Sequence, residues 1–500
     1  MNKMNSADQK QKKIPYGGYY QNQIPEYDPT LTETGPGTPA GEYLRRFWHP
    51  VCMSEELTDV PRFLMIMGEE LVAFRDGSGQ IGVLLAHCSH RGASLEYGMI
   101  KEHGIMCSYH GFTYDVDGTC LEVPMPTGEE EEGRRIAKNI CQGAYKAFER
   151  SGLVFAYMGP PEEEPLFPEW EGDFTLHPDD KSVPFSNVQT CNWLQVQDNA
   201  ADQFHHTPLH TTAVVPGHEQ GTTFGEAGAG AFVVRPDLQF FPVHDGKSMA
   251  WTSSRRVDDK YLFIRINHQI LPNVSFHSYL FEDGSKVKHF SRIHMHRWTV
   301  PIDDTTSKMI GWRTMGPNID TRGVGNEDLT GFEKIDFLEG QCGIRRPERE
   351  KYGPGELPPV AKHHRERDCY SAAQHAPGDY EVQASQRPIA VHALENPMKF
   401  DGGVYLSRKQ LREAITGNNP KATGEAWREW LERLDGKPNT YCSGNVLEIP
   451  IGATPEEEVE RRRDVAQRCI TAITESDNMP KVDRDAFVKQ KFTEIERDFR

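Results

Sequence analysis

A chain of 500 residues is longer than one hydrophobic core usually supports, so at least two structural units with extensions are expected. Hydrophobic residues make up 37% and charged residues 26%, which is typical of a soluble globular protein, and no stretch approaches the roughly 18 consecutive apolar residues of a membrane span. The formal net charge of -18 argues against a nucleic-acid partner, because phosphates are bound by clustered Lys and Arg.

The N-terminal segment is polar and basic, and no apolar stretch follows it, so a secretory signal is not expected. Together with ten scattered cysteines, this favours the reducing cytoplasm, where cysteines are core residues or metal ligands rather than disulfide partners. Cys52, Cys120 and Cys141 belong to no ligand pattern and are expected in the core. Residues 1–43 are predicted to be an N-terminal arm, and 14–43, rich in Tyr, Pro, Gly and Thr, to lie extended over a surface.

Residues 44–165 have the pattern of a small all-β domain. Short apolar runs separated by turn residues predict strands at 63–67, 71–74, 81–85 and 153–156. The acidic run Glu129–Glu132 is expected in a surface loop of this domain.

Residues 166–410 are predicted to form a second unit of α+β class, because strands are followed by helices. Its expected elements, in chain order, are a helix-like segment at 190–210, a Gly-rich loop at 217–230 and several long strands between 232 and 316. The Gly-rich loop is either a mobile lid or a plain surface loop. Residues 411–500 are predicted to be a helical C-terminal extension, in which Thr454 caps a helix that begins at Pro455.

Two short segments each combine one cysteine with one histidine. Cys88-Ser89-His90 is followed, after sixteen residues, by Cys107-Ser108-Tyr109-His110. This donor set suits a [2Fe–2S] cluster in which both cysteines bind one iron and both histidines bind the other. A tetrahedral zinc site is the alternative, since zinc also accepts two Cys and two His. Zinc sites usually group Cys with Cys and His with His, so the mixed order favours the cluster.

With its flanking residues, this pattern resembles the Rieske domain of ring-hydroxylating oxygenases. The similarity extends through Arg91-Gly92 and through Gly111-Phe112-Thr113-Tyr114, although the family often has Trp in place of Phe112. The glycine in each segment would let the loop turn tightly over a cluster. The resemblance implies the following ligands of a Rieske [2Fe–2S] cluster: Cys88, His90, Cys107 and His110.

The segment 192–210 carries a second constellation, the order D-x₂-H-x₄-H at Asp202, His205 and His210. Two His and one carboxylate form the facial triad of non-haem Fe(II) oxygenases, which leaves positions open for O₂ and substrate. In Rieske oxygenases this order lies inside N-W-x-Q…N-x₂-D, which the chain also has. The resemblance implies that His205 and His210 bind a mononuclear Fe(II), and that Asp202 links His205 to a Rieske histidine of a neighbouring subunit. His206 has the wrong spacing and is expected to pack or to hydrogen-bond.

The remaining iron ligand is a carboxylate that spacing alone does not identify. The stretch 378–389 resembles the aspartate-bearing helix of the family, in which a Q-x-P-I-like tail follows the ligand. This resemblance favours Asp379, with Glu381 as its competitor. The family usually has Glu where this chain has Asp198, a departure that leaves the ligands unchanged.

The resemblance covers most of residues 40–410 and is nearest to phthalate-dioxygenase-like enzymes and aryl O-demethylases. It implies an all-β Rieske domain followed by a helix-grip (START-like) α+β catalytic domain with an antiparallel sheet and C-terminal helices. The activity that it implies is O₂-dependent hydroxylation or O-demethylation of a small aromatic compound.

The expected partners follow from the same comparison. No G-x-G-x-x-G follows a strand, so electrons from NAD(P)H are expected to arrive through a separate reductase or ferredoxin. A homotrimer, in which one Rieske domain meets the next catalytic domain, is the family expectation. The alternative is a Rieske electron-transfer protein without oxygenase activity, but His205, His210 and Asp379 argue against it because a carrier needs no second metal site.

Overall fold

The computed structural model describes residues 14–170, 181–210, 235–278, 288–291, 293–315, 379–477 and 479–500. The Gly-rich loop predicted at 217–230 lies outside the described residues. Among the helices of the described stretches, none is long and apolar enough to cross a membrane.

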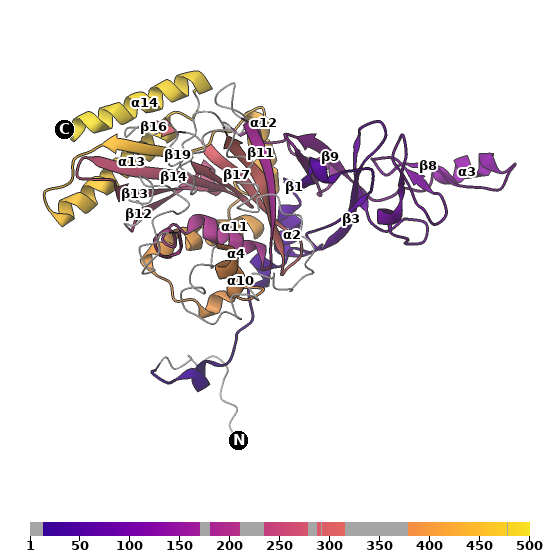
Figure 1. Ribbon diagram of the computed structural model, residues 1–500, viewed down its shortest axis with the longest axis horizontal. Coiled ribbons are helices and arrows are strands. Elements are labelled where there is room, and N and C mark those ends of the chain that lie inside the picture. Colours follow the sequence, from indigo (N-terminus) through magenta and orange to yellow (C-terminus); the bar gives the residue numbers. More distant parts are fainter. Residues whose placement is uncertain are drawn as a thin grey trace, which may run out of the picture.

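A lobe of two antiparallel sheets projects to one side of the molecule (Figure 1). The larger sheet has the order β1-β10-β9-β4-β3-β2, and the smaller one has the order β5-β6-β7-β8. All four strands predicted from apolar runs are confirmed, as β2, β3, β4 and β10. The strands are β1 Trp48–Met53, β2 Arg62–Ile66, β3 Glu69–Arg75, β4 Ile81–Leu85, β5 Met99–Ile100, β6 Ile105–Met106, β7 Thr113–Tyr114, β8 Cys120–Glu122, β9 Ala144–Arg150 and β10 Leu153–Tyr157.

The acidic run predicted as a loop is instead the start of helix α3, Glu130–Ala137. The acidic first turn interacts favourably with the positive end of the helix dipole. Arg134 and Arg135 pair with Glu131 and Glu132 three residues earlier. The loop prediction was wrong because it considered the charge of the run and not this i,i+3 pairing.

The rest of the chain is built on a nine-stranded antiparallel sheet with the order β11-β18-β17-β15-β14-β13-β12; β19 pairs with β14, and β16 with β19. The strands are β11 Lys181–Gln189, β12 Asp237–Val243, β13 Ser248–Arg256, β14 Tyr261–Ile270, β15 Val274–Ser278, β16 Lys288–Ser291, β17 Ile293–Pro301, β18 Ser307–Met315 and β19 Ser443–Glu448. The predicted long strands are confirmed, and with the helices they make this unit α+β.

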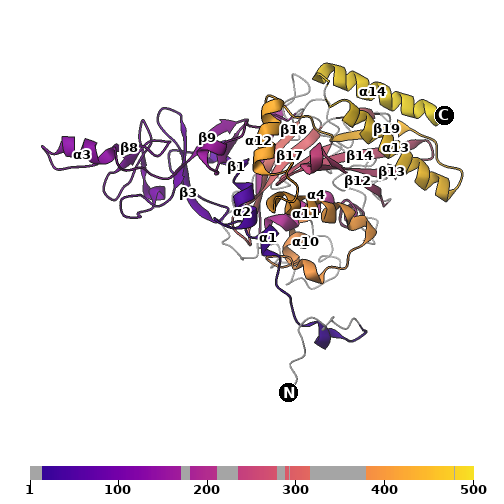
Figure 2. The ribbon, with the colours of Figure 1, turned by 180° about the vertical axis from the view of Figure 1, so that it is seen from behind.

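Helices cover both faces of the large sheet (Figures 1 and 2). On one face lie α4, α10 and α11, and on the other lie α13 and α14. The helices after the lobe are α4 Trp193–Ala201, α5 His206–His210, α10 Asp379–Ser385, α11 Gly402–Ile415, α12 Gly424–Arg433, α13 Pro455–Glu475 and α14 Lys481–Asp498. Short 3₁₀ helices are η1 Gly18–Gln21, η2 Ser54–Glu56, η3 Leu95–Tyr97, η4 Pro161–Glu163, η6 His244–Gly246, η9 His392–Leu394 and η10 Lys399–Asp401.

The alternation of side chains along β14 separates the two layers. Leu262, Ile264 and Ile266 are buried together with side chains of α13 and α14. Gln269 points to the opposite face, where its Nε2 donates to the carbonyl of Gln197 in α4 over 3.2 Å. One face of the sheet is therefore an apolar core, and the other face, toward α4, is partly polar.

The N-terminal arm has two parts. Most side chains of residues 14–27 are exposed, and this stretch runs away from the body (Figures 1 and 2). The helices α1 Pro29–Thr32 and α2 Pro39–Leu44 instead bury Leu31 and Tyr43 in the core. Among the described residues, the stretch 14–27 is therefore not laid over the body in the way that the sequence predicted.

Two further expectations need correction. The C-terminal segment predicted as helical also contributes β19, whose residues 443–448 pair with 261–266 of β14. Five of the six residues of β19 are buried, so the strand lacks the polar alternation that reveals a strand in sequence. Cys52 and Cys120 are buried as expected, but Cys141, whose backbone pairs with Thr119 in an isolated bridge outside the named strands, is exposed.

Replacement of Phe492 by Ala should destabilise the protein by about 3–5 kcal/mol, because this fully buried ring joins α14 to the sheet. Chemical denaturation followed by circular dichroism measures the loss. Lys489→Ala, an exposed change on the same helix, is the control and should shift stability by less than about 0.5 kcal/mol. Equal, small effects of both changes would show that α14 is not part of the cooperative core.

Candidate active site

The predicted cluster ligands come together at two neighbouring loops of the lobe. Cys88 and Cys107 are 3% and 2% exposed, so both thiols are inside the protein. His90 is exposed and His110 is partly exposed, and their ring centroids are 4.7 Å apart. The four side chains therefore form a set with thiols inside and imidazoles at the surface.

The two loops have the same backbone pattern. The N–H of Gly92 donates to the carbonyl of Cys88 over 2.8 Å, and the N–H of Gly111 donates to that of Cys107 over 2.9 Å. Each glycine has a positive φ, +76° and +78°, which side chains with a Cβ rarely adopt. Each loop thus holds its Cys and His on the same side of a tight turn.

The surroundings of the two thiols fit an iron–sulfur group. Burial raises the pKa of the Cys107 thiol, and the nearby Cys88 adds to this effect. Two such thiols ionise together only beside a cation. The hydroxyl of Tyr114 is 3.2 Å from Cys88 Sγ and can donate to it, while Phe112 stacks on His90 at 4.3 Å between centroids.

The residues predicted around the second metal also meet. His205 Nδ1 lies 3.2 Å from Asp202 Oδ2, and His205 Nε2 lies 3.3 Å from Asp379 Oδ1. The imidazole is thus held between two carboxylates that are 177 residues apart in sequence. The distance between His205 Nε2 and Asp379 suits two neighbouring ligands of one metal ion. His205 Nδ1 faces Asp202 instead.

Electrostatics agree with this arrangement. Burial acts to lower the pKa of His205, but the two carboxylates outweigh it and raise the pKa to about 9. Burial acts to raise the pKa of Asp202, yet hydrogen bonds from His205 and from backbone N–H groups hold that pKa below its usual value. A divalent cation at Nε2 would replace the proton there, since a metal binds neutral imidazole.

Hydrogen bonds from α4 to α10 and to the segment after α10 explain why these distant residues meet. Gln195 Nε2 donates to the carbonyls of Gln383 and Arg387, over 3.0 Å each, and its Oε1 accepts from the N–H of Ala390. Asn199 Nδ2 donates to Asp379 Oδ1 over 3.3 Å. Sequence reasoning noted Gln195 and Asn199 only as letters of a motif and did not predict these roles.

A buried ion network supports α4 from the other side. Arg408 of α11 makes several hydrogen bonds to Asp198, with Nη2 2.6 Å from Oδ2, and it also binds both carboxylate oxygens of Glu395. Burial raises the pKa of Asp198 despite this pairing. The unusual Asp at this position therefore has a specific partner, which only the structure reveals.

Two predicted ligand positions are only partly described. His210 is the last residue of α5, and its side chain lies outside the described residues, as does that of Glu381. Within the described part of the chain, no three His, Cys, Asp or Glu side chains converge on one point. His206 is buried, with its ring 4.7 Å from that of His205.

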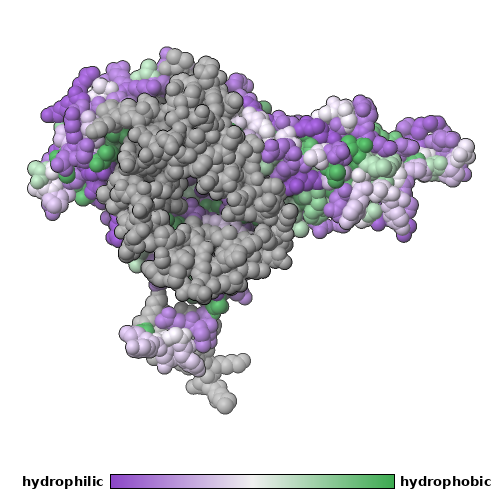
Figure 3. All heavy atoms as spheres, in the orientation of Figure 1, coloured by the Kyte–Doolittle hydropathy of each residue, from purple (hydrophilic) through white to green (hydrophobic). Residues whose placement is uncertain are grey.

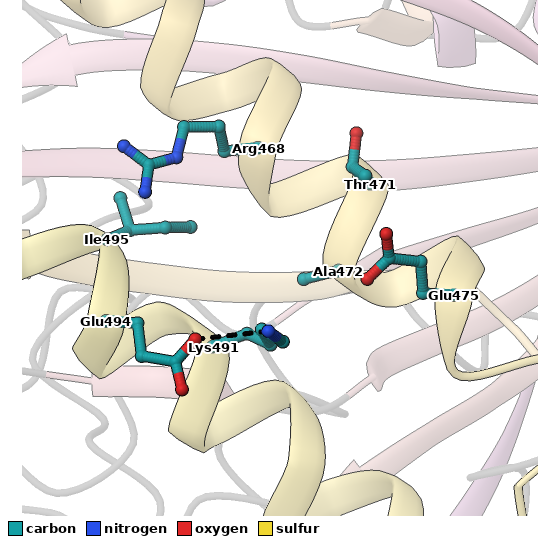
Figure 4. Close-up of a pocket in the computed structure, with 7 residues that line it drawn as sticks. All are labelled: Arg468, Thr471, Ala472, Glu475, Lys491, Glu494 and Ile495. Carbon is teal, nitrogen blue, oxygen red and sulfur yellow. Dashed lines mark hydrogen bonds and ion pairs between the residues drawn. The ribbon is translucent and has the colours of Figure 1, made fainter.

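A hollow of about 510 Å³ lies beside this site. Carboxylates of Asp202, Glu395 and Asp401 line it, together with His205. A second hollow, of about 210 Å³, lies between α13 and α14 (Figure 4). Its charged groups are exposed and partly paired, with Lys491 Nζ 3.1 Å from Glu494 Oε2, so it offers no built binding site.

Comparison with known proteins gives the class. Residues 47–137 match the family described as Rieske [2Fe-2S] domain. The chain is 40% identical over 485 residues, 96% of both chains, to the tert-butanol monooxygenase / tert-amyl alcohol desaturase oxygenase subunit of Aquincola tertiaricarbonis. It is 32% identical to phenoxybenzoate dioxygenase subunit alpha of Ectopseudomonas oleovorans, over 80% of this chain and 87% of that one. It is also 35% identical to the phthalate 4,5-dioxygenase oxygenase subunit of Pseudomonas putida, over 39% of this chain and 44% of that one.

The chain therefore belongs to the Rieske non-haem iron oxygenases and is the oxygenase component, or alpha subunit, of such a system. This family combines a [2Fe–2S] cluster with a mononuclear iron. The reading as an oxygenase is confirmed, and the alternative of an electron carrier is set aside.

Replacement of Tyr114 by Phe should lower the reduction potential of the cluster by on the order of 50 mV, because the hydrogen bond to Cys88 Sγ stabilises the reduced form, which carries more negative charge. A redox titration followed by electron paramagnetic resonance measures the shift. The exposed Tyr97→Phe should leave the potential unchanged. An unchanged potential in Tyr114→Phe would show that this hydroxyl does not act on the cluster.

Replacement of Arg408 by Met should destabilise the protein by about 3–5 kcal/mol, because it leaves the buried Asp198 without its cation. The double variant with Asp198→Asn should recover part of the loss, since the unpaired charge is then removed. Thermal and chemical denaturation measure both. Lys409→Met, an exposed neighbour, is the control; a double variant no more stable than Arg408→Met alone would contradict the pairing.

Proposed function

We propose that this oxygenase component uses O₂ to hydroxylate or O-demethylate a small, aromatic substrate, with electrons from NAD(P)H delivered by a separate reductase or ferredoxin. The observation that carries the proposal is the Asp202–His205–Asp379 array in a chain with a Rieske domain. The named relatives support an aromatic substrate in part: two act, by name, on phenoxybenzoate and phthalate, and one acts on tert-butanol.

Each site residue has a role in this proposal. Cys88 and Cys107 bind one cluster iron, and His90 and His110 bind the other. The mononuclear Fe(II) is bound by the following three residues: His205, His210 and Asp379. When bound, this iron supplies the activation of O₂. Asp202 is a positioning residue, because it accepts the Nδ1 proton of His205 and thereby directs Nε2 toward the metal.

Electron transfer is proposed to run between copies of the chain in a homotrimer. One cluster loop joins β6 and β7 of the small sheet and the other follows β4 of the larger sheet, so both belong to the lobe, whereas α4 and α10 lie in the body (Figure 1). Apolar residues appear on the surface of the lobe (Figure 3), and Tyr97, Met99 and Tyr109 near the loops are exposed. The hollow beside Asp202 is where we propose that the tip carrying His110 of a neighbouring copy docks.

We further propose the cytoplasm as the location and the following domain limits: an arm at 1–43, the Rieske domain at 44–165, the catalytic domain at 166–410 and a C-terminal extension at 411–500. The limits of the Rieske domain, 44–165, are supported by the lobe, whose strands lie between residues 48 and 157.

The reaction is tested with a panel of methoxylated and unsubstituted aromatic compounds, with tert-butanol as a non-aromatic member, in single turnovers of the reduced, iron-loaded protein. Formaldehyde with a matching phenol identifies O-demethylation, and a hydroxylated ring identifies hydroxylation. Oxidation of tert-butanol alone would contradict the aromatic proposal.

Replacement of Asp202 by Asn should leave both metal sites occupied and slow reoxidation of the reduced cluster by at least about 100-fold, because the Nδ1 partner no longer carries charge. Stopped-flow absorbance of the cluster, with substrate and O₂ present, measures the rate, and metal analysis checks the occupancy. Asp401→Asn, which changes a carboxylate in the same hollow that accepts from the N–H of Met398, is the matched control. Native reoxidation in Asp202→Asn would contradict the proposed role.

A further inference from the structure

Four arginines, Arg255, Arg265, Arg297 and Arg313, lie on the sheet face that α4 covers. Arg265 is two residues from Asn267 and four from Gln269 on β14, so all three side chains share the face on which Gln269 meets α4. Arg297 of β17 lies opposite Ser275 of β15 and donates to its hydroxyl over 3.2 Å. Ser275 in turn pairs with Gln269, which places Arg297 on the same face.

Among the described residues, neither the Arg265 nor the Arg297 guanidinium lies within ion-pair distance of a carboxylate. Arg265 is 6% exposed; its Nε makes no hydrogen bond, and its Nη2 is 3.5 Å from the carbonyl oxygen of Ser278. Beyond Ser275, Arg297 contacts only the thioether of Met309, a weak acceptor, 2.6 Å from Nη1. Burial lowers the pKa of both guanidinium groups to about 10, and Asp379 opposes this effect for Arg297, so Arg297 lies within electrostatic range of the iron ligand.

Asn267 adds a second unusual feature. It is fully buried, and neither its Nδ2 nor its Oδ1 has a hydrogen-bond partner within the described residues. Buried amides are normally satisfied, because an unmade hydrogen bond costs their full desolvation. The side-chain carbonyl of Gln269, also buried, has no partner either.

A structural arginine in the same chain looks different. Arg484 of α14 is fully buried, but its Nε donates to Ser476 Oγ over 3.0 Å and its Nη2 donates to the carbonyl of Thr440 over 2.8 Å. The face toward α4 therefore holds an excess of buried donors and positive charge that this chain, as described, does not satisfy.

We propose that Arg265 and Arg297, with the amide of Asn267, bind the carboxylate of the substrate and so restrict this enzyme to organic acids. The inference rests on the proposed iron site, because Arg297 lies near Asp379. A guanidinium presents a planar pair of N–H donors that matches a carboxylate, and the ion pair compensates charges that are otherwise buried without a partner. A neutral alcohol would leave both guanidinium groups uncompensated.

Binding to the iron-loaded holoenzyme tests this inference without turnover. Isothermal titration calorimetry compares benzoate, 4-methoxybenzoate and pivalate, each with the corresponding neutral amide. We expect the acids to bind and the amides to bind at least about tenfold more weakly, and Arg265→Met and Arg297→Met each to weaken acid binding by about tenfold or more. Arg412→Met removes an exposed arginine of α11 and should leave the affinity unchanged.

Thermal unfolding separates binding from folding. Without ligand, the Tm of Arg265→Met should be no lower than that of the native chain, because an uncompensated buried charge is removed. The increase in Tm that an acid causes in the native chain should be lost. A purely structural arginine would give the opposite result, a lower Tm without ligand.

The inference is overturned if no acid binds, if the amides bind as tightly as the acids, or if both arginine variants keep native affinity. Turnover is measured separately on the same panel. Oxygenated products from neutral compounds would contradict the inference and leave the oxygenase function intact. Arginine-dependent binding of acids without any oxygenated product would count against the proposed function alone.

Discussion

The amide of Gln195 is the contact on which the catalytic site depends. This side chain links α4 to α10 and to the segment that follows α10. Its N–H₂ group donates to two backbone carbonyls, and its oxygen accepts from a backbone N–H. Because backbone groups do not change rotamer, the two segments are held in one register. That register brings Asp379 to His205, with Asn199 beside them. Without this register, Asp379 would not be held beside His205, and Asp202 alone would flank the imidazole.

Charge is distributed unevenly around α4. On its outer side, Arg408 is surrounded by Asp198 and Glu395, so positive and negative groups balance. On its inner side, Arg265 and Arg297 form no ion pair among the described residues, although Asp379 lies within electrostatic range of Arg297. The helix thus separates a balanced ion network, which holds it in position, from an unbalanced one, which is available to a ligand. Arginine thus holds the helix in position on one side and is proposed to bind a ligand on the other.

Local patterns were the most predictable part of the protein. The Cys-His loops could be recognised because each ligand pair lies within four residues of one turn, and the apolar runs of the lobe identified β2, β3, β4 and β10. Asp379 came from resemblance, since no spacing rule joins it to His205 across such a distance. The partner of Asp198 was not predictable, because any of the 56 Lys and Arg could have served. β19 was missed because a strand buried on both sides shows no alternation.

The pairing of β19 with β14 has a consequence for synthesis of the chain on the ribosome. The lobe closes when β10 pairs with β1, so all of its strands are available once residue 157 has emerged. In contrast, residues 261–266 keep an open hydrogen-bonding edge until 443–448 arrive. The Rieske lobe can therefore fold early, while the catalytic sheet stays incomplete until residue 448 has emerged. A chain terminated before residue 443 would retain a folded lobe beside an exposed strand edge, which is a template for aggregation.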